Sequence, residues 1–332
     1  MVDDAPLRSR LGAGAEFRLI EQALQGLGTA AGVRVGPGDD AAVLDGGPFV
    51  VTVDVSVEGV HFRRDWMSPQ EIGERAARSA LSDLAAMAAE PVALLTTVGV
   101  DAASASESVP DLLAGVRVAA AEVGAALVGG DLTRVPAGSA WLVDVVAIGR
   151  AATPVLRSGG RPGDELWVTG RLGGAALAVR QWEAGHAPGP QLLEAFLRPR
   201  PRIEAARWLA GQGVLHALID LSDGLLGDAG HLAAASGLDL EIDAAALPLH
   251  EGLLSSGLGV EEARSLALGG GEDYELAFLA PPGRVQPLAL RFERETGVLI
   301  TRVGDAQAGE GRVRVHGLDR LPRSHDHFGS GA

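Results

Sequence analysis

"ALIDLSDGLLGDAGHL", residues 217–232, joins an apolar run to a helix-like pattern through a short polar segment. The apolar residues lead directly to Asp220, Ser222 and Asp223, and apolar spacing then resumes as expected for a helix. A helix N-cap would account for Asp223, and we interpret Asp228, one turn further on, as a solvent-facing or capping residue. Neither interpretation explains Asp220, a carboxylate at the end of an apolar run.

The chain has 332 residues, of which 47% are hydrophobic, and this length favours two domains with separate cores. "GRAATPVLRSGGRPGDELWV", residues 149–168, is rich in Gly, Pro and Arg and is the best candidate for a boundary. We therefore expect an N-terminal domain over 1–150 and a C-terminal domain over 151–332. Strand and helix patterns alternate in both, which predicts an α/β or α+β fold.

Periodicity places the expected elements along the chain. The first half is predicted to contain strands within 47–62, 91–100 and 139–150, and helices near 16–27, 70–89 and 110–124. The second half is predicted to contain strands near 166–169, 274–279, 298–303 and 312–316, a helix over 170–184 and a second helix after "RPRPRIEAARWLA", residues 198–210.

Strict alternation in the first of these strands separates an apolar side from a polar side, as in a half-buried strand. Four valines face one way, and four polar residues face the other: Val51, Val53, Val55 and Val57, against Thr52, Asp54, Ser56 and Glu58.

Charge and composition exclude several classes of function. The net charge is −15, from 43 acidic and 28 basic residues, which argues against a nucleic-acid partner. The chain has no cysteine, so disulfides, thiolate metal sites and cysteine nucleophiles are excluded. No apolar run approaches the roughly 20 residues of a membrane span, and "MVDDAPLRSR" lacks a signal-peptide pattern. We expect a cytoplasmic protein without a membrane partner.

Familiar motifs for other chemistries are missing from the sequence. Nothing matches G-x-x-x-x-G-K-[ST], and the chain contains no lysine. "GRLGG", residues 170–174, is not a G-x-G-x-x-G fingerprint, and neither G-x-S-x-G nor H-E-x-x-H occurs. Hydride transfer, acyl transfer and zinc-dependent hydrolysis are therefore poorly supported.

Acidic residues recur beside glycine in two other segments. "GPGDDAAVL", residues 36–44, contains Asp39 and Asp40, which form either a capped turn or a carboxylate pair that needs a cation. Asp131 follows an apolar run and two glycines in "AALVGGDLTR", and we expect it at a strand end, where open α/β sheets present ligands.

Two more carboxylates lie within predicted regular elements. Asp54 shares a strand face with Thr52 and could simply be solvated. Asp83 falls on the apolar stripe of the predicted Ala-rich helix, where a carboxylate needs either a cation or a basic partner such as Arg75 or Arg78. Together, five separated segments supply hard oxygen ligands, the type that Mg²⁺ binds alongside substrate phosphates. Metal-assisted phosphoryl transfer is the chemistry that fits this pattern.

Six motifs in order resemble the thiamine-monophosphate kinase family. They are "GPGDDAAVL", "DVSVEGVHF", "LSDLAAM", "GGDLTR", "IDLSDGL" and "GGEDYEL", and the resemblance extends from about residue 16 to 328. It implies a two-domain PurM-like fold, with an N-terminal mixed-sheet dimerisation domain and a C-terminal α/β domain. It also implies a homodimer, and ATP-dependent phosphorylation of thiamine monophosphate to thiamine diphosphate with several Mg²⁺ ions.

The resemblance further assigns site residues by their position in these motifs. The implied metal ligands are Asp39, Thr52, Val53 (through its carbonyl), Asp54, Asp83, Asp131, Asp220 and Asp223. The implied ATP contacts are Gly130, Asp131, Arg157 and Ser222, and the implied substrate contacts are His61, Glu272 and either Phe328 or His325. Family members often have an aromatic residue before the glycine that is Gly115 here, whereas this chain has Ala114.

Direct in-line transfer is the expected mechanism, with Arg157 and Asp220 as its catalytic residues. The acceptor phosphate is already ionised, so positioning and charge neutralisation matter more than a general base. The alternatives are a non-catalytic nucleotide- or metal-binding relative and another ATP-dependent enzyme of the superfamily. The lack of cysteine disfavours the selenophosphate synthetase and hydrogenase maturation chemistries, and the D-G-V-G-T-K signature of aminoimidazole ribonucleotide synthetase is missing.

Overall fold

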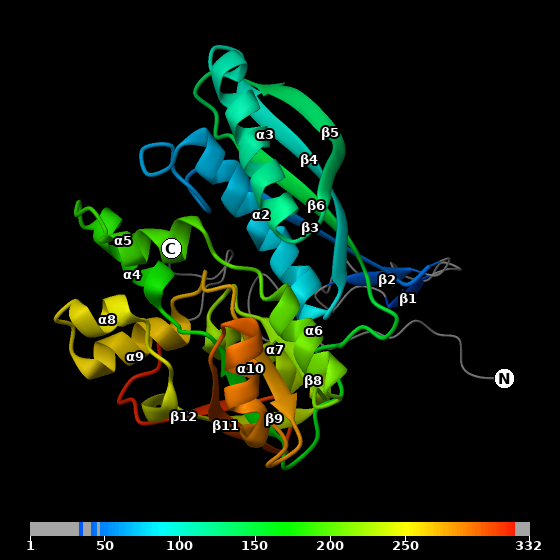
Figure 1. The fold of residues 1–332 in the computed structure, drawn as a ribbon. Coiled ribbons are helices and arrows are strands. Elements are labelled where there is room, and N and C mark those ends of the chain that lie inside the picture. The colour runs from blue at the N-terminus through cyan, green and yellow to red at the C-terminus, as the bar shows by residue number, and fades with distance from the viewer. Residues whose placement is uncertain (1–32, 36–40, 45–46, 323–332) are drawn as a thin grey trace.

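A computed structural model describes residues 33–35, 41–44 and 47–322. Its described residues form two six-stranded sheets, one on each side of a central group of helices (Figure 1). The first sheet ends at Arg150 and the second begins at Glu165. The helix predicted near 16–27 lies outside the described residues.

The first sheet has the strand order β1-β2-β3-β6-β4-β5. Its strands are β1 (Val33–Val35), β2 (Ala42–Leu44), β3 (Phe49–Val57), β4 (Glu90–Asp101), β5 (Ala126–Val135) and β6 (Leu142–Arg150). Only the β4–β5 pair among these is parallel, so the sheet is mixed. The three strands predicted in this half are confirmed. The expectation for Asp131 was wrong, because β5 continues through this residue to Val135 instead of ending there.

Helices α2 (Pro69–Ala86) and α3 (Ala105–Glu122) cover one face of this sheet (Figure 1). Ser68 and Glu71 form a reciprocal capping box at the start of α2, and Pro69 occupies its first turn, which explains why the helix begins there. The helix predicted near 110–124 begins earlier than expected. Pro110 lies inside α3 instead of starting it.

The burial of β3 is the reverse of what its alternation suggests. Ser56 is 8% exposed on the side that faces α2, whereas Val53 is 62% exposed and Val55 is 44% exposed on the other side. The valine face is therefore uncovered in a single chain, and the polar face packs against a helix. Alternation correctly predicted the strand, but it does not say which of the two faces is covered.

The second sheet has the strand order β12-β9-β11-β7-β10-β8. Its strands are β7 (Glu165–Thr169), β8 (Ala217–Asp220), β9 (Leu238–Asp243), β10 (Leu276–Ala280), β11 (Ile300–Ala308) and β12 (Val313–His316). The surrounding helices are α4 (Gly174–Glu183), α5 (Pro190–Leu197), α6 (Ile203–Gly211), α7 (Leu225–Ser236), α8 (Glu251–Ser255), α9 (Val260–Gly269) and α10 (Ala289–Thr296).

Predictions for this half were mostly confirmed, including the strands near 166–169, 298–303 and 312–316 and the helix over 170–184. The helix expected after residues 198–210 instead lies within that stretch, as α6. The prolines that precede it favour an extended backbone, so the helix begins only at Ile203. β9 was not predicted.

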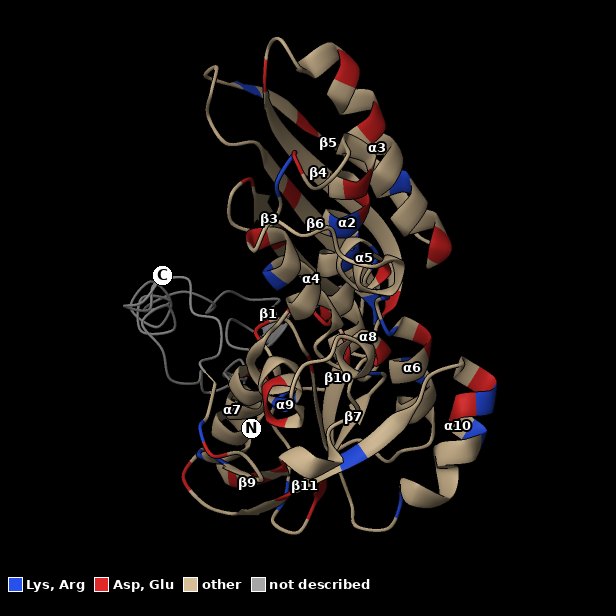
Figure 2. Cartoon of the chain, turned by 90° about the vertical axis from the view of Figure 1, so that its left-hand side faces the viewer, with Lys and Arg blue, Asp and Glu red and all other residues tan. Residues whose placement is uncertain are grey.

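The interface between the two halves is organised around α2. This helix contacts β3 and β6 of the first sheet, and it also contacts α5, α6 and β8 of the second half. Fourteen of its residues are buried, including the charged residues Glu74, Arg75 and Arg78. Figure 2 shows basic residues around α2 and α5, and acidic residues along the outer side of α3. None of the helices in the described part of the chain is both long and apolar enough to cross a bilayer.

Two glycines allow α2 and α3 to cross closely. A Cβ at Gly73 would lie 2.0 Å from the carbonyl oxygen of Leu112, and a Cβ at Gly115 would lie 2.0 Å from that of Gln70. Both contacts are with backbone atoms, which cannot move aside as a flexible side chain does. The close approach of these helices therefore depends on the two glycines.

We expect Gly115→Ala to lower the free energy of unfolding by about 2 kcal/mol, because overpacking outweighs the better helix propensity of Ala. Gly230→Ala in α7 is the matched control, since a Cβ there meets no atom within 4 Å, and it should be neutral or stabilising by up to about 1 kcal/mol. Urea denaturation of both variants measures this. Equal stability of the two variants would contradict the crossing argument.

Candidate active site

A cavity of about 230 Å³ lies between the two halves of the molecule and is lined mainly by polar groups. We call it the carboxylate crevice. Its lining residues are Val53, Asp54, Val60, His61, Ser79, Asp83, Asp220, Ser222, Asp223, Gly270, Gly271, Glu272 and Tyr274. Segments more than 150 positions apart in the sequence therefore meet in this crevice. Most of the predicted site residues are among the residues that line it.

The N-terminal half contributes two carboxylates through β3 and α2. Alternation along β3 places Thr52 and Asp54 on the side that faces α2. The Thr52 hydroxyl donates a hydrogen bond to Asp83 Oδ2 over 2.5 Å. The suggested structural partners of Asp83 are engaged elsewhere as well: Arg75 pairs with Glu272, and Arg78 with Glu74 and Glu122.

The C-terminal half contributes Asp220, Ser222 and Asp223 from the turn between β8 and α7. β8 ends at Asp220, and this carboxylate is only 4% exposed. Ser82 of α2 donates a hydrogen bond to Asp220 Oδ2 over 2.7 Å, so the helix holds the two halves together at this point. Asp223 is not the N-cap of α7, because Gly224 occupies that position with φ at 97°.

Asp228 is buried, so the solvent-facing alternative of our sequence interpretation was wrong, whereas the capping alternative agrees with its contact to the backbone before α7. It is 3% exposed, and its Oδ2 accepts a hydrogen bond from the Asp223 backbone N–H over 3.2 Å. Burial, together with the nearby charges of Asp223 and Asp220, raises the pKa of Asp228 well above its ordinary value, and the Arg157 cation opposes this shift. Arg157 therefore lies close enough to act on this acidic group.

A candidate set of metal ligands adjoins the crevice. One oxygen or nitrogen atom from each of Asp223, Asp228 and His231 can lie within 4.8 Å of the others. Asp228 and His231 were not among the predicted ligands. They are three residues apart and so face the same side of α7, but neither residue follows a turn signal that would have identified it from sequence.

The segment 272–275 has unusual backbone geometry. Glu272 and Tyr274 are in the left-handed region, with φ at 65° and 48°. Few non-glycine residues adopt this conformation, and strain of this kind is often found at functional sites. Glu272 forms an ion pair with Arg75, and the Tyr274 hydroxyl is hydrogen-bonded to Ser79 Oγ over 2.9 Å. Both contacts connect the segment to α2.

Asp273 and Glu275 of the same segment instead bind within the C-terminal half. Both carboxylate oxygens of Asp273 accept from the Gly173 backbone N–H, over 2.9 and 3.1 Å. Glu275 accepts from the Thr169 hydroxyl over 2.7 Å and pairs with Arg202. Burial, with a smaller effect of the Glu275 and Glu272 charges, raises the pKa of Asp273 well above its ordinary value.

His61 is placed by a backbone contact. Its Nδ1 accepts a hydrogen bond from the Val57 N–H over 3.1 Å, so the neutral ring carries its proton on Nε2. The ring lines the carboxylate crevice. A neutral donor of this kind is suited to a phosphate or hydroxyl oxygen.

Gly130 and Asp131 do not line the crevice within one chain. Strand register places Asp131 beside Thr97, Thr97 beside Asp144, and Asp144 beside Val55. Asp131 therefore lies on the uncovered face with Val55, three strands and about 14 Å away. Ala114 is half-buried on α3. Asp39, His325 and Phe328 lie outside the described residues.

Models of the AIR synthase related protein family match nearly the whole described chain. The N-terminal domain model matches residues 38–151, and the C-terminal domain model matches residues 161–317. The thiamine-monophosphate kinase of Mycobacterium tuberculosis (strain CDC 1551 / Oshkosh) is 36% identical over 290 residues, which is 85% of this chain and 85% of the relative. That of Escherichia coli (strain K12) is 39% identical over 264 residues, which is 75% of this chain and 77% of the relative.

Solved structures show the same fold. AaThiL complexed with AMPPCP and TMP matches with a TM-score of 0.81 and 30% identity, over 95% of this chain and 97% of that chain. Thiamine-monophosphate kinase from Stenotrophomonas maltophilia K279a matches with a TM-score of 0.74 and 33% identity, over 92% of this chain and 98% of that chain. The HypE–HypF complex, at 18% identity and a TM-score of 0.72, shares the fold alone.

We expect Asp273→Asn to gain stability relative to the wild type as the pH rises. The raised pKa means that the folded state holds the proton of Asp273 more tightly than the unfolded state. This stabilisation is complete below the ordinary value of 3.8 and is lost as the pH rises through the raised pKa. An uncharged Asn does not lose it.

Urea denaturation between about pH 4 and about pH 8 measures the effect. Asp111→Asn, at an exposed position of α3, is the matched control and should follow the wild type. Parallel stability curves for wild type and Asp273→Asn would show that burial does not shift this group.

Proposed function

The chain belongs to the thiamine-monophosphate kinases within the AIR synthase related proteins, and we propose that its carboxylate crevice performs their reaction by direct in-line transfer with bound Mg²⁺. The enzyme is a kinase that uses ATP to phosphorylate thiamine monophosphate. The observation that supports the proposed mechanism is the meeting of carboxylates from both halves of the molecule in one crevice.

The donor set of the crevice fits Mg²⁺. Asp54 and Asp83 from one half face Asp220 and Asp223 from the other, and the Thr52 hydroxyl lies beside them. These are hard oxygen ligands, and so many carboxylates do not remain ionised together without a cation. When bound, Mg²⁺ would supply positive charge to the phosphate oxygens and lower the repulsion between the two anionic substrates.

We assign the metal-holding role to the residues that the family motifs mark. They are Asp39, Thr52, Val53 through its carbonyl, Asp54, Asp83, Asp131, Asp220 and Asp223. Ser82 orients Asp220, and the Asp228 carboxylate fixes the backbone at Asp223, so both act by positioning a ligand. Asp131 lies on the uncovered face, away from the other members of this set. It would act together with them only through a second chain or through a bound nucleotide that reaches both places.

The remaining residues would bind the two substrates. Ser222, with Gly130, Asp131 and Arg157, would contact ATP. His61 would donate from Nε2 to the acceptor phosphate, and Glu272, held by Arg75, would contact thiamine monophosphate together with Phe328. A terminal oxygen of thiamine monophosphate then forms a bond to the γ-phosphorus as the bond to the β–γ bridging oxygen breaks, and ADP leaves.

The uncovered face of the first sheet supports our proposal of a homodimer formed by the N-terminal domain, residues 1–150. Register places Val53 beside Val146 and Val146 beside Leu95, so the apolar row crosses three strands. In the described residues, α2 and α3 cover the other face (Figure 1). An apolar face of this extent is typical of an interface.

Two carboxylates on this face are consistent with its burial against a second copy. Asp144 Oδ1 is buried without a hydrogen-bond partner among the described residues, and desolvation raises the pKa of this carboxyl. Asp131 lies on the same face. Pairing of two copies through this face would bring Asp131 to the interface.

We expect Asp220→Asn to reduce kcat by about 100-fold or more, because it removes a charged ligand that only the transfer step requires. Its hydrogen bond from Ser82 can be retained by the amide oxygen, so the fold should survive. A coupled assay of ADP release from ATP and thiamine monophosphate, with the melting temperature as a control for folding, measures this. Asp111→Asn should keep full activity, and near-normal turnover by Asp220→Asn would refute the assignment.

We expect Val53→Asp to convert the dimer to a monomer, because two carboxylates would have to be buried at the interface. Size-exclusion chromatography with light scattering measures the mass. Val118→Asp, at a 39% exposed position on α3, places the same charge on the opposite side of the layer and should leave the mass unchanged. A monomeric wild type would contradict the proposal, as would a Val53→Asp variant that remains dimeric.

A further inference from the structure

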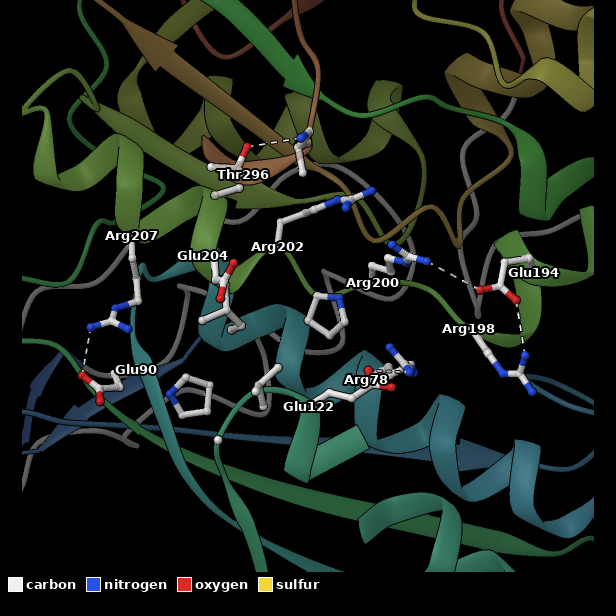
Figure 3. Close-up of a pocket in the computed structure, with 17 residues that line it drawn as sticks. Arg78, Glu90, Glu122, Glu194, Arg198, Arg200, Arg202, Glu204, Arg207 and Thr296 are labelled. Carbon is white, nitrogen blue, oxygen red and sulfur yellow. Dashed lines mark hydrogen bonds and ion pairs between the residues drawn. The ribbon is translucent and has the colours of Figure 1, made fainter. Parts of the chain in front are cut away.

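A second cavity between the two halves, of about 780 Å³, is separate from the carboxylate crevice. It reaches α2 at Arg78, whereas the crevice reaches this helix at Ser79 and Asp83. No described residue lines both. Its walls come from α2, β4 and the end of α3 on one side, and from residues 194–207 and 296–298 on the other (Figure 3).

The lining of this cavity is rich in arginine, although four glutamates also line it. Five arginines line it, and we call it the arginine cavity: Arg78, Arg198, Arg200, Arg202 and Arg207. Three come from "RPRPR", residues 198–202, where each proline keeps the preceding arginine out of a helical conformation. The planar guanidinium group matches the geometry of phosphate and carboxylate oxygens.

Three of the five arginines are committed to carboxylates at short range. Arg78 bonds to Glu74 over 2.8 Å and to Glu122 over 2.7 Å. Arg202 forms a two-point pair with Glu275. Arg207 pairs with Glu90 over 2.9 Å. The carboxylates Glu90 and Glu204 thus lie at the Arg207 end of the cavity (Figure 3).

The other two arginines share one carboxylate. Glu194 lies 3.4 Å from Arg198 and 3.9 Å from Arg200, both longer than a good charged hydrogen bond. Arg198 is also 3.6 Å from Glu74, which already serves Arg78. Arg200 is 72% exposed. Among the described residues, neither guanidinium group therefore has a carboxylate partner closer than 3.4 Å, and these are the loosest ion pairs of the cavity.

A connected cavity of about 350 Å³ extends the same end toward α4. It is lined by Arg198, Arg200 and Arg202, and it continues to Arg171 and to Gly174 in the first turn of α4. A helix N-terminus adds partial positive charge to this wall. Glu194, Glu275 and Asp273 also line this cavity. Burial raises the pKa of Asp273 and so disfavours its negative form.

We propose that the Arg198–Arg200 end of this cavity binds the phosphate group of a phosphorylated small molecule. The cavity volume lies within the roughly 300–1,000 Å³ that small-molecule sites occupy. Pro91, Val123, Ile203 and Val298 give the remaining wall apolar surface for the body of such a ligand. Because the walls belong to both halves, a bound ligand would bridge them. The site does not depend on the proposed metal chemistry of the crevice.

Magnesium dependence distinguishes the two sites. Without Mg²⁺ the carboxylate crevice repels polyphosphates, whereas the arginine cavity needs no cation. Isothermal titration of the full-length protein with inorganic diphosphate, in EDTA and at low ionic strength, should therefore show saturable binding. Arg200→Ala should weaken this binding about tenfold, as expected for loss of a charged hydrogen bond, while kinase turnover is unchanged.

Matched variants complete the test. Arg117→Ala, at an exposed position of α3, removes the same charge elsewhere and should bind diphosphate as the wild type does. Asp220→Asn should lose turnover but retain binding in EDTA, so the proposed function and this site can fail independently. ADP and thiamine diphosphate should bind more tightly than inorganic diphosphate if the apolar wall contributes to binding, and titrations with both compounds measure this.

Two results would overturn the proposal. One is the lack of saturable diphosphate binding by the wild type in EDTA. The other is an unchanged affinity in both Arg200→Ala and the double variant Arg198→Ala/Arg200→Ala, with melting temperatures that show both to be folded.

Discussion

Ser82 and Asp83, adjacent residues of α2, connect the two halves of the molecule. Ser82 donates to Asp220 of the C-terminal half, and Asp83 accepts from Thr52 of the N-terminal half. One helical turn therefore connects β3 to the end of β8. The carboxylates that meet there repel one another, and burial increases the cost. Hydroxyl donors offset part of this cost, and the Mg²⁺ that we propose for this crevice would offset more of it.

The strained segment 272–275 connects this junction to the rest of the C-terminal half. Glu272 and Tyr274 reach Arg75 and Ser79 on α2, while Asp273 and Glu275 reach Gly173 and Arg202 on the other side. Successive side chains of this segment thus alternate between contacts with α2 and contacts within the C-terminal half. The left-handed conformations of Glu272 and Tyr274 permit this alternation, and the contacts offset their cost. A shift between the two halves would have to break several of these contacts together.

Sequence patterns predicted the elements and the chemistry better than they predicted the contacts. Asp54, Asp83, Asp220 and Asp223 were identified because each interrupts an apolar pattern or follows one, and the structure brings all four together. The burial of Asp228 was not predicted, because helical periodicity cannot show that a neighbouring turn packs against its carboxylate and donates to it. The covered face of β3 was also beyond prediction, because alternation is symmetrical and does not say which face a helix covers. Asp131 was assigned a role through its motif, but only the register of the paired strands shows that it lies on the other face.

The two cavities beside α2 represent opposite ways of accommodating an anion. The carboxylate crevice has the wrong sign for phosphate and can hold it only with cations between the two negative partners, which allows binding to depend on metal. The arginine cavity offers guanidinium groups directly, but three of its five arginines are paired at short range with glutamates. The pairing is loosest where Arg198 and Arg200 share Glu194, at 3.4 and 3.9 Å. Selectivity for an anion at that end therefore comes from an incomplete ion-pair network. A single added carboxylate would complete the ion pairs and remove this selectivity.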